Sequence, residues 1–226
     1  MLPIGPDTTP HEDGGRLCLA AVNTVLWRRS DAPVDRIGGY PELVRLVGRA
    51  GWLGSTAEPA AELAPELAAA AEAYPAAARQ ALARAVELRE ALFPLFSAVA
   101  AGQRPAAAHL ELLNEALAEG LGRLAVLALP GSRAFVAGWQ DRTALDLPRW
   151  QIAASAGLLL TSADRDRVKQ CPGDRCGWVF VDASRNRSRR WCDSRECGNR
   201  ERVRAHYERT RFGGRSRTAR SVGGHA

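Results

Sequence analysis

Four cysteines near the carboxyl terminus form two pairs with identical internal spacing. Four residues separate Cys171 from Cys176 and Cys192 from Cys197, and fifteen residues separate the two pairs. Zn²⁺ binds four thiolates as a tetrahedron with Zn–S distances of about 2.3 Å, and a small module gains much of its folding free energy from that binding. We expect one structural zinc ion here, because a closed set of four thiolates leaves no coordination position for a substrate. The alternative, reduced structural cysteines or a redox pair, does not explain the repeated spacing.

The segment between the two cysteine pairs has the pattern of a hairpin. Residues 178–181 alternate as a strand, with Trp178 and Phe180 on one face. Residues 182–188 are rich in turn formers, and residues 189–191 are predicted to form the return strand. Gly173 and Gly198 allow tight turns next to the ligands.

A basic helix is predicted after the last cysteine, with Asn199 as its N-cap. One face of this helix, at helical spacing, consists of Arg200, Arg204, Tyr207 and Arg211. Val203, with part of Tyr207, is expected to pack back onto the hairpin. The predicted hairpin turn and return strand add a second basic group: Arg185, Arg187, Arg189 and Arg190.

The charge of the chain is divided unevenly along its length. Residues 171–226 contain 14 arginines against six acidic residues, a net charge of +8, whereas residues 1–170 carry −2. An arginine run is often only a solvated face, but here two basic groups lie on one metal-bound module, which favours nucleic-acid binding. We expect DNA rather than RNA, because Tyr207 alone offers no platform for stacking bases.

The remaining residues predict a mostly α-helical domain with one small β-hairpin, an α+β fold. Helices are expected from Leu17, from Pro41, through residues 57–101 with a break at Pro75 and a kink at Pro94, and over 105–119 and 148–160. Residues 124–129 and 134–139 flank a Pro-Gly-Ser turn and predict the hairpin. Residues 161–164 begin a short connecting helix.

These patterns divide the chain into four parts. Residues 1–15 are expected to be flexible, residues 16–165 form the mostly helical domain, residues 166–212 form the Cys₄ zinc module, and residues 213–226 form a disordered basic tail. Cys18 lies outside the cysteine cluster and is expected to be a small buried hydrophobic residue.

The sequence argues against membrane insertion, secretion and catalysis. No apolar run approaches the roughly 20 residues of a membrane span, and the start of the chain lacks the pattern of a signal peptide. A cytoplasmic location, where thiols stay reduced, also fits the cysteine spacing. Four scattered histidines and the absence of a P-loop or a nucleophile elbow predict that the chain is not an enzyme.

The zinc module resembles the bacterial CGNR zinc finger. The resemblance rests on Cys-Gly-Trp-Val-Phe-Val-Asp at 176–182, Ser-Arg-Asn at 184–186, Arg-Arg-Trp-Cys at 189–192 and Cys-Gly-Asn-Arg at 197–200. It implies that Cys171, Cys176, Cys192 and Cys197 are the zinc ligands. Residues 15–24 resemble the opening of the ABATE domain, which precedes this finger in proteins described as stress-induced transcription regulators.

The amino-terminal resemblance departs from the family pattern at one place. Where the family commonly has Asp-Phe before Val-Asn-Thr, this chain has Ala20 and Ala21. A ligand site that depends on that aspartate would be altered or absent here. Asn23 and Arg28 remain as polar candidates, although a capping or solvent-facing role is expected for each.

The leading hypothesis is a DNA-binding transcriptional regulator with an amino-terminal sensing or assembly domain. Under this hypothesis, we expect the protein to form a homodimer and its amino-terminal domain to bind a small-molecule effector. The contacts to DNA are predicted to come from Arg185, Arg187, Arg189, Arg190, Arg200, Arg204 and Arg211. The alternative is a zinc-stabilised module that binds another protein, or RNA, without reading a DNA sequence.

Overall fold

The computed structural model describes residues 16–50, 63–128, 131 and 133–213. Its elements, in chain order, are α1 (Leu17–Val22), β1 (Val25–Leu26), β2 (Val34–Asp35), α2 (Tyr40–Ala50), α3 (Leu63–Ala73), α4 (Pro75–Ala100), α5 (Ala107–Leu121), β3 (Leu124–Ala128), β4 (Phe135–Trp139), α6 (Leu147–Thr161), the 3₁₀ helix η2 (Ala163–Arg167), β5 (Val168–Gln170), β6 (Val179–Val181) and α7 (Cys197–Gly213). The predicted flexible residues 1–15 lie outside the described residues. So does the predicted basic tail, residues 213–226, apart from Gly213, which is the last residue of α7.

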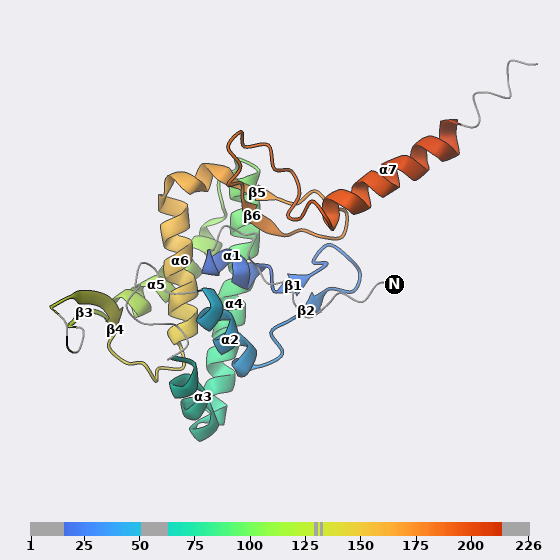
Figure 1. Ribbon diagram of the computed structural model, residues 1–226. Coiled ribbons are helices and arrows are strands. Elements are labelled where there is room, and N and C mark those ends of the chain that lie inside the picture. The colour runs from blue at the N-terminus through green and yellow to red at the C-terminus, as the bar shows by residue number, and fades with distance from the viewer. Residues whose placement is uncertain (1–15, 51–62, 129–130, 132, 214–226) are drawn as a thin grey trace, which may run out of the picture.

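The body of the molecule is built on α4, which contacts the other helices of the domain (Figure 1). Leu92, Leu95 and Phe96 on α4 are completely buried, and α6 contributes Trp150 and Ile152 to the same core. The predicted break at Pro75 is confirmed, because Pro75 is the first residue of α4, a position where the missing N–H costs nothing. The fold is therefore mostly helical, as the helical spacing of apolar residues predicts.

Two short strands lie between the first and second helices. The first helix ends at Val22, and β1 and β2 follow it and pair with each other. The side chain of Asp35 holds β2 in place. Its carboxylate accepts a hydrogen bond from the Ile37 backbone N–H at 2.9 Å and another from Arg89 on α4 at 2.7 Å. The second predicted helix is confirmed as α2, with Leu43, Val44 and Val47 buried.

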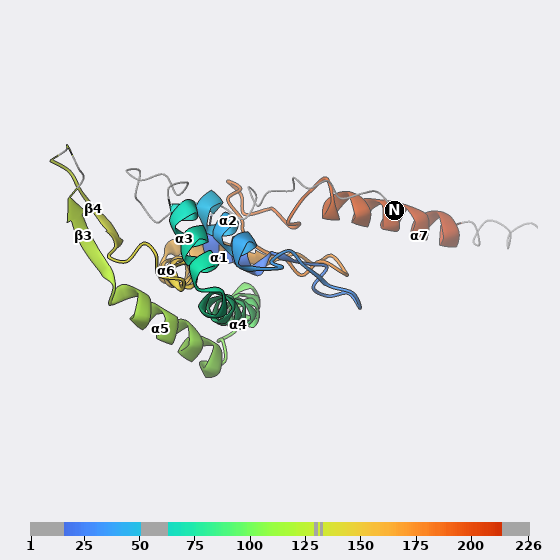
Figure 2. The ribbon, with the colours of Figure 1, turned by 90° about the horizontal axis from the view of Figure 1, so that it is seen from below.

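The predicted hairpin in the middle of the chain is confirmed. β3 and β4 pair in antiparallel register, with Leu124 opposite Trp139 and Ala128 opposite Phe135. Trp139 is buried at the base of the hairpin, where its ring centroid lies 5.9 Å from that of Trp150. The rest of the hairpin extends away from the helices (Figure 2).

The strand pairing of the zinc module differs from the prediction. β6 pairs with β5, which precedes the first cysteine, and residues 189–191 form no return strand. The Asp182 carboxylate replaces strand pairing there, because it accepts a hydrogen bond from the Arg189 backbone N–H at 3.0 Å. β6 also joins two cores: Val179 and Val181 pack with the helical body, and Phe180 packs with the cysteines.

α7 extends away from the body at the end opposite the β3–β4 hairpin (Figures 1 and 2). In the described part of the chain, no helix combines the length and the apolar character that a membrane crossing requires.

Candidate metal centre and nucleic-acid interface

The four cysteines of the two pairs converge on one point. Their Sγ atoms all lie within 4.8 Å of one another, and all four residues are buried. The Sγ of Cys192 lies 3.5 Å from that of Cys176 and 3.6 Å from that of Cys197. Four sulfurs bound to one zinc ion at 2.3 Å would be about 3.8 Å apart. The spacing therefore matches a tetrahedral Cys₄ site.

The chemistry of this cluster also favours a cation. The neighbouring sulfurs of Cys171 and Cys176 raise the pKa of Cys192 and Cys197, whereas the pKa of Cys171 and Cys176 is lowered, so the four thiols do not ionise together readily. A divalent ion that prefers thiolates removes this conflict by stabilising all four charges. The cysteines thus hold one structural zinc ion.

Backbone hydrogen bonds shape the first cysteine turn. The Cys171 N–H donates to the Trp178 carbonyl at 2.8 Å, and the Cys176 N–H donates to the Gly173 carbonyl at 3.0 Å. A Cβ atom on Gly173 would lie 3.3 Å from the Cys176 Cβ and 3.6 Å from the Cys171 Sγ. Glycine keeps this space open, so the two sulfurs can approach the same ion.

The start of α7 is fixed by the second cysteine pair. Asp193 closes the preceding turn, since its Oδ1 accepts hydrogen bonds from the N–H groups of Arg195 and Glu196 at 2.5 and 2.8 Å. The helix then begins at Cys197, so Asn199 lies inside it and the prediction of an Asn199 N-cap was wrong. As Cys197 is a ligand, the metal holds the first turn of α7.

Most side chains of α7 are exposed. Val203 is 46% exposed and Tyr207 is 69% exposed, so the prediction that they pack on the hairpin was wrong. The reason is the direction of the helix, which leaves the module instead of folding back along it (Figure 1). Arg200, Arg204 and Arg211 are exposed, and Arg204 forms ion pairs with Glu201 and with Asp174 in the first cysteine turn.

The arginine-rich loop is organised by the buried carboxylate of Asp182. It accepts hydrogen bonds from the Ser184 N–H at 2.9 Å, from the Arg189 N–H at 3.0 Å and from Lys169 Nζ at 2.6 Å. Burial favours a higher pKa for Asp182, but the hydrogen bonds from Lys169 and Ser184 outweigh it and lower the pKa to about 2. Lys169 Nζ also donates to the carbonyls of Arg187 and Arg189.

The four loop arginines do not have equivalent positions. Arg185, Arg187 and Arg190 are exposed, and the Arg190 guanidinium lies 5.0 Å from the Trp191 ring centroid. Arg189 instead turns inward, where its Nε donates to the Trp191 carbonyl at 3.0 Å and its guanidinium lies 4.5 Å from the Phe180 ring centroid. Three of the four therefore present their side chains to solvent.

Asn23 is the C-cap residue of α1, so the expected capping role is confirmed, but its side chain does not face solvent. It is buried, its Nδ2 donates to the Val179 carbonyl at 2.8 Å, and its Oδ1 accepts from the Val179 N–H at 3.0 Å. The structure thus assigns Asn23 to the junction between the helical body and β6. Local sequence pattern does not indicate this contact, because Val179 lies far from Asn23 along the chain.

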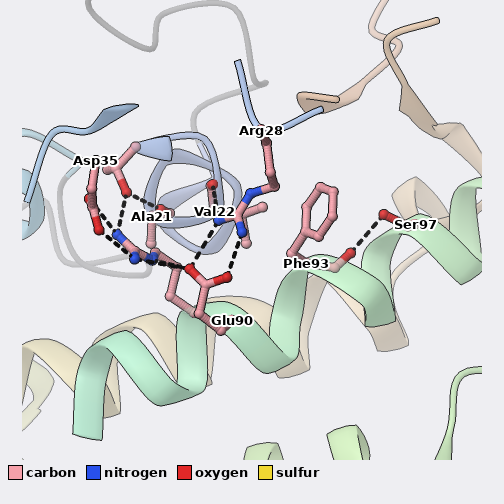
Figure 3. A network of polar contacts seen from close by, with 9 residues as sticks. Ala21, Val22, Arg28, Asp35, Glu90, Phe93 and Ser97 are labelled. Atoms are coloured by element: carbon pink, nitrogen blue, oxygen red, sulfur yellow. Dashed lines mark hydrogen bonds and ion pairs between the residues drawn. The ribbon is translucent and has the colours of Figure 1, made fainter. Parts of the chain in front are cut away.

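Arg28 is also held by the body of the protein (Figure 3). Its guanidinium binds Glu90 at 2.5 Å and lies 4.4 Å from the Phe93 ring centroid. Next to it, the buried Arg89 makes two hydrogen bonds of 2.7 Å to Asp35. Of the two roles expected for Arg28, the capping one is confirmed, because its Nη2 donates to the carbonyl of Val22, the last residue of α1, at 3.3 Å. The solvent-facing role was wrong, because α4 supplies both a carboxylate and an aromatic ring to the guanidinium.

Ala20 and Ala21 are both buried in the core, as is Cys18. The burial expected for Cys18 is confirmed. The two alanines bring no polar side chain to this part of α1, where the resemblance implied an aspartate.

Comparison with known families matches two models to the chain. The model described as ABATE, "Putative stress-induced transcription regulator", matches residues 15–163. The CGNR zinc finger matches residues 167–210, which include all four ligands and most of α7. No curated protein matches the chain.

Proposed function

Since the chain belongs to the ABATE family and carries a CGNR zinc finger, we propose that it is a transcription regulator that binds duplex DNA through its zinc module. One observation carries this proposal: α7 begins at a zinc ligand and projects from the body with its arginines exposed (Figure 2). A single helix fits the major groove of B-DNA, which is about 12 Å wide.

The composition of α7 suits a polyanion. The helix has five arginines and two glutamates, and Arg200 and Arg211 share one face with the apolar side chains of Val203 and Tyr207. Arginine forks bind guanine edges or phosphates, and apolar groups contact the thymine methyl group. Arg204 is tied to Asp174, so we assign it to holding α7 against the first cysteine turn.

The loop supplies a second set of contacts. Arg185, Arg187 and Arg190 are exposed on one short segment, and we assign them to the phosphate backbone. Arg189 is engaged with the Trp191 carbonyl and the Phe180 ring, so we assign it to shaping the loop. The sequence predicted that seven arginines contact DNA. We now assign five of them to DNA contacts, and Arg189 and Arg204 to positioning the loop and α7.

The contacts are preorganised, which reduces the entropy lost on binding. The zinc ion holds the first turn of α7, and Asp182 with Lys169 holds the loop. The ABATE domain would act as the sensing or assembly part, with the protein in the cytoplasm, where thiols stay reduced. A small-molecule effector of that domain belongs to this proposal as a prediction.

A second candidate function is docking onto an acidic protein surface. The exposed Val203 and Tyr207 favour it, since apolar groups beside arginines are common in protein interfaces. Under that alternative, the wild type binds DNA only weakly, and Tyr207→Ala abolishes binding of the protein partner.

The proposal is tested by fluorescence anisotropy with random-sequence duplex DNA. The double change Arg200→Ala, Arg211→Ala should weaken binding by at least tenfold and reduce the salt slope by about 2, because two contacts to the nucleic acid are lost. Arg79→Ala, an exposed arginine of α4, is the matched control and should bind like the wild type. Unchanged affinity and slope in the double variant would refute the role of α7.

A further inference from the structure

The β3–β4 hairpin is an apolar arm that extends from the helical body (Figures 1 and 2). Its strands read Leu-Ala-Val-Leu-Ala and Phe-Val-Ala-Gly-Trp, without a charged residue in either. Within the described residues, each strand pairs only with the other, so both outer edges are open. Isolated two-stranded hairpins are marginally stable in water, and an exposed apolar one is a candidate for pairing with another chain.

On one face of the arm, the side chain of Leu127 covers Gly138 of the paired strand. A Cβ atom on Gly138 would lie 2.6 Å from the Leu127 Cδ1, so the leucine side chain occupies the space above the glycine. Leu127 is partly buried as a result. This face is therefore partly covered within the hairpin itself.

The other face is open toward the tip. At its base, Trp139 is 6% exposed, whereas Val126 is 75% exposed and Phe135 is 70% exposed farther along the same face. Directly paired residues point to the same side of an antiparallel ribbon, so Val126 lies beside Ala137, and Phe135 lies beside Ala128. The open face thus has two large side chains on one diagonal and two alanines on the other.

This arrangement is complementary to itself. When two such faces stack across a two-fold axis parallel to the strands, Val126 of each copy meets Ala137 of the other. Phe135 of each copy then meets Ala128 of the other, so every large side chain opposes a small one. The match depends on the register between β3 and β4. If one strand were shifted by one residue, Val126 and Phe135 would no longer each lie beside an alanine on this face.

From this match and from the lack of charge on the strands, we propose that the open face of the arm binds a second copy of this chain as a two-fold dimer. An uncharged face gives no attraction to a charged partner, and two copies of it do not repel each other. An isologous contact of this kind uses the same patch on both subunits. The inference goes beyond the proposed function and does not depend on DNA binding.

The contact between two hairpins is small. Stable complexes bury roughly 800 Å² on each partner, and four side chains of this size cover less than that. We therefore expect a dimer with a dissociation constant in the micromolar range. A dimer would also contain two copies of α7. The contact would leave both of them uncovered, since the arm and α7 lie at opposite ends of the molecule.

Sedimentation velocity of the full-length, zinc-loaded protein without DNA tests the proposal, over about 1 to 200 μM. The wild type should change from monomer to dimer across this range. Phe135→Ser and Val126→Ser should each raise the dissociation constant by roughly 10-fold to 100-fold, because each dimer loses two apolar contacts. Leu158→Ser, at a leucine of α6 that is 47% exposed, is the matched control and should dimerise like the wild type.

A charge pair tests the register. Val126→Lys and Ala137→Asp should each prevent self-association, and an equimolar mixture of the two variants should recover the dimer, because the lysine of one copy faces the aspartate of the other. Circular dichroism and zinc content confirm that every variant is folded. A wild type that stays monomeric throughout the range, arm variants that dimerise like the wild type, or a mixture that stays monomeric would overturn the proposal.

Discussion

The side chain of Asn23 and the backbone of Val179 exchange two hydrogen bonds, at 2.8 and 3.0 Å, in the buried junction between α1 and β6. Val179 and its neighbour Val181 also pack in the core of the helical body, while Phe180 between them packs on the zinc cluster. The zinc module is therefore an extension of the helical core and shares its stability.

Asn23→Ala is expected to destabilise the whole protein. It leaves the N–H and the carbonyl of Val179 without partners in a buried position, which costs about 1–3 kcal/mol for each group. Urea unfolding should show a loss of about 2–6 kcal/mol. Asn114→Ala, an exposed asparagine of α5, is the control and should change stability by less than about 0.5 kcal/mol. Equal stability of the two variants would contradict the account of the junction.

Zinc removal should weaken the helical body as well as the module. Because β6 belongs to both cores, chelation with EDTA should lower the melting temperature of the single cooperative transition and reduce the near-ultraviolet signal of Trp139 and Trp150. Cys192→Ser should have the same effect, and Cys18→Ala should still bind one zinc ion per chain. A body that melts at an unchanged temperature after zinc removal would show that the two parts are independent.

Asp182 should contribute stability that depends on pH. Its pKa of about 2 in the folded protein lies below the value of about 3.9 for an unfolded aspartate. A lowered pKa means that the carboxylate stabilises the fold above about pH 4, and that this contribution is lost as the pH falls through about 2.

Asp182→Asn should therefore cost about 2 kcal/mol at pH 7, from the loss of charged hydrogen bonds, and the difference from the wild type should shrink below about pH 4. Both proteins release zinc on acidification, so the comparison is made between them at each pH. Asp31→Asn, at an exposed aspartate, is the control. A difference that stays constant down to pH 2 would contradict the role of the carboxylate.

Two glycines of the packed pair α5 and α6 should respond oppositely to alanine. A Cβ atom on Gly120 would lie 2.8 Å from the Trp150 Cβ, so Gly120→Ala should destabilise the protein by about 1–3 kcal/mol. A Cβ atom on Gly157 would lie 3.4 Å from the Leu117 methyl groups, an ordinary contact. Gly157→Ala should therefore be neutral or stabilise by up to about 1 kcal/mol through its helix propensity. Thermal unfolding of both variants checks the contrast, and the reverse order would contradict the described packing.

The sequence predicted the features that depend on local pattern. The repeated cysteine spacing predicted the metal cluster, apolar periodicity predicted α2, α4 and α6, and the Pro-Gly-Ser turn predicted the β3–β4 hairpin. Each of these signals lies within a short stretch of chain.

Features that depend on distant partners were not predictable in this way. β5 has only three residues, Val-Lys-Gln, which is too short for an alternation signal, so its pairing with β6 was missed. The buried roles of Asn23 and Asp182 depend on partners elsewhere in the chain. Asp182, two residues before Ser184, does have the spacing of an Asx turn, and this signal could have identified it. The exposure of Val203 follows from the direction of α7, which local spacing does not encode.

The most direct test of the central claim is the binding of the zinc-loaded protein to random-sequence duplex DNA, measured by fluorescence anisotropy at several salt concentrations with an EDTA-treated control. Five arginine contacts predict that log K falls by about 4.5 for each log unit of salt, and that zinc removal abolishes binding. Absence of binding at low salt, or binding that persists unchanged after zinc removal, would contradict the claim that the zinc module holds DNA.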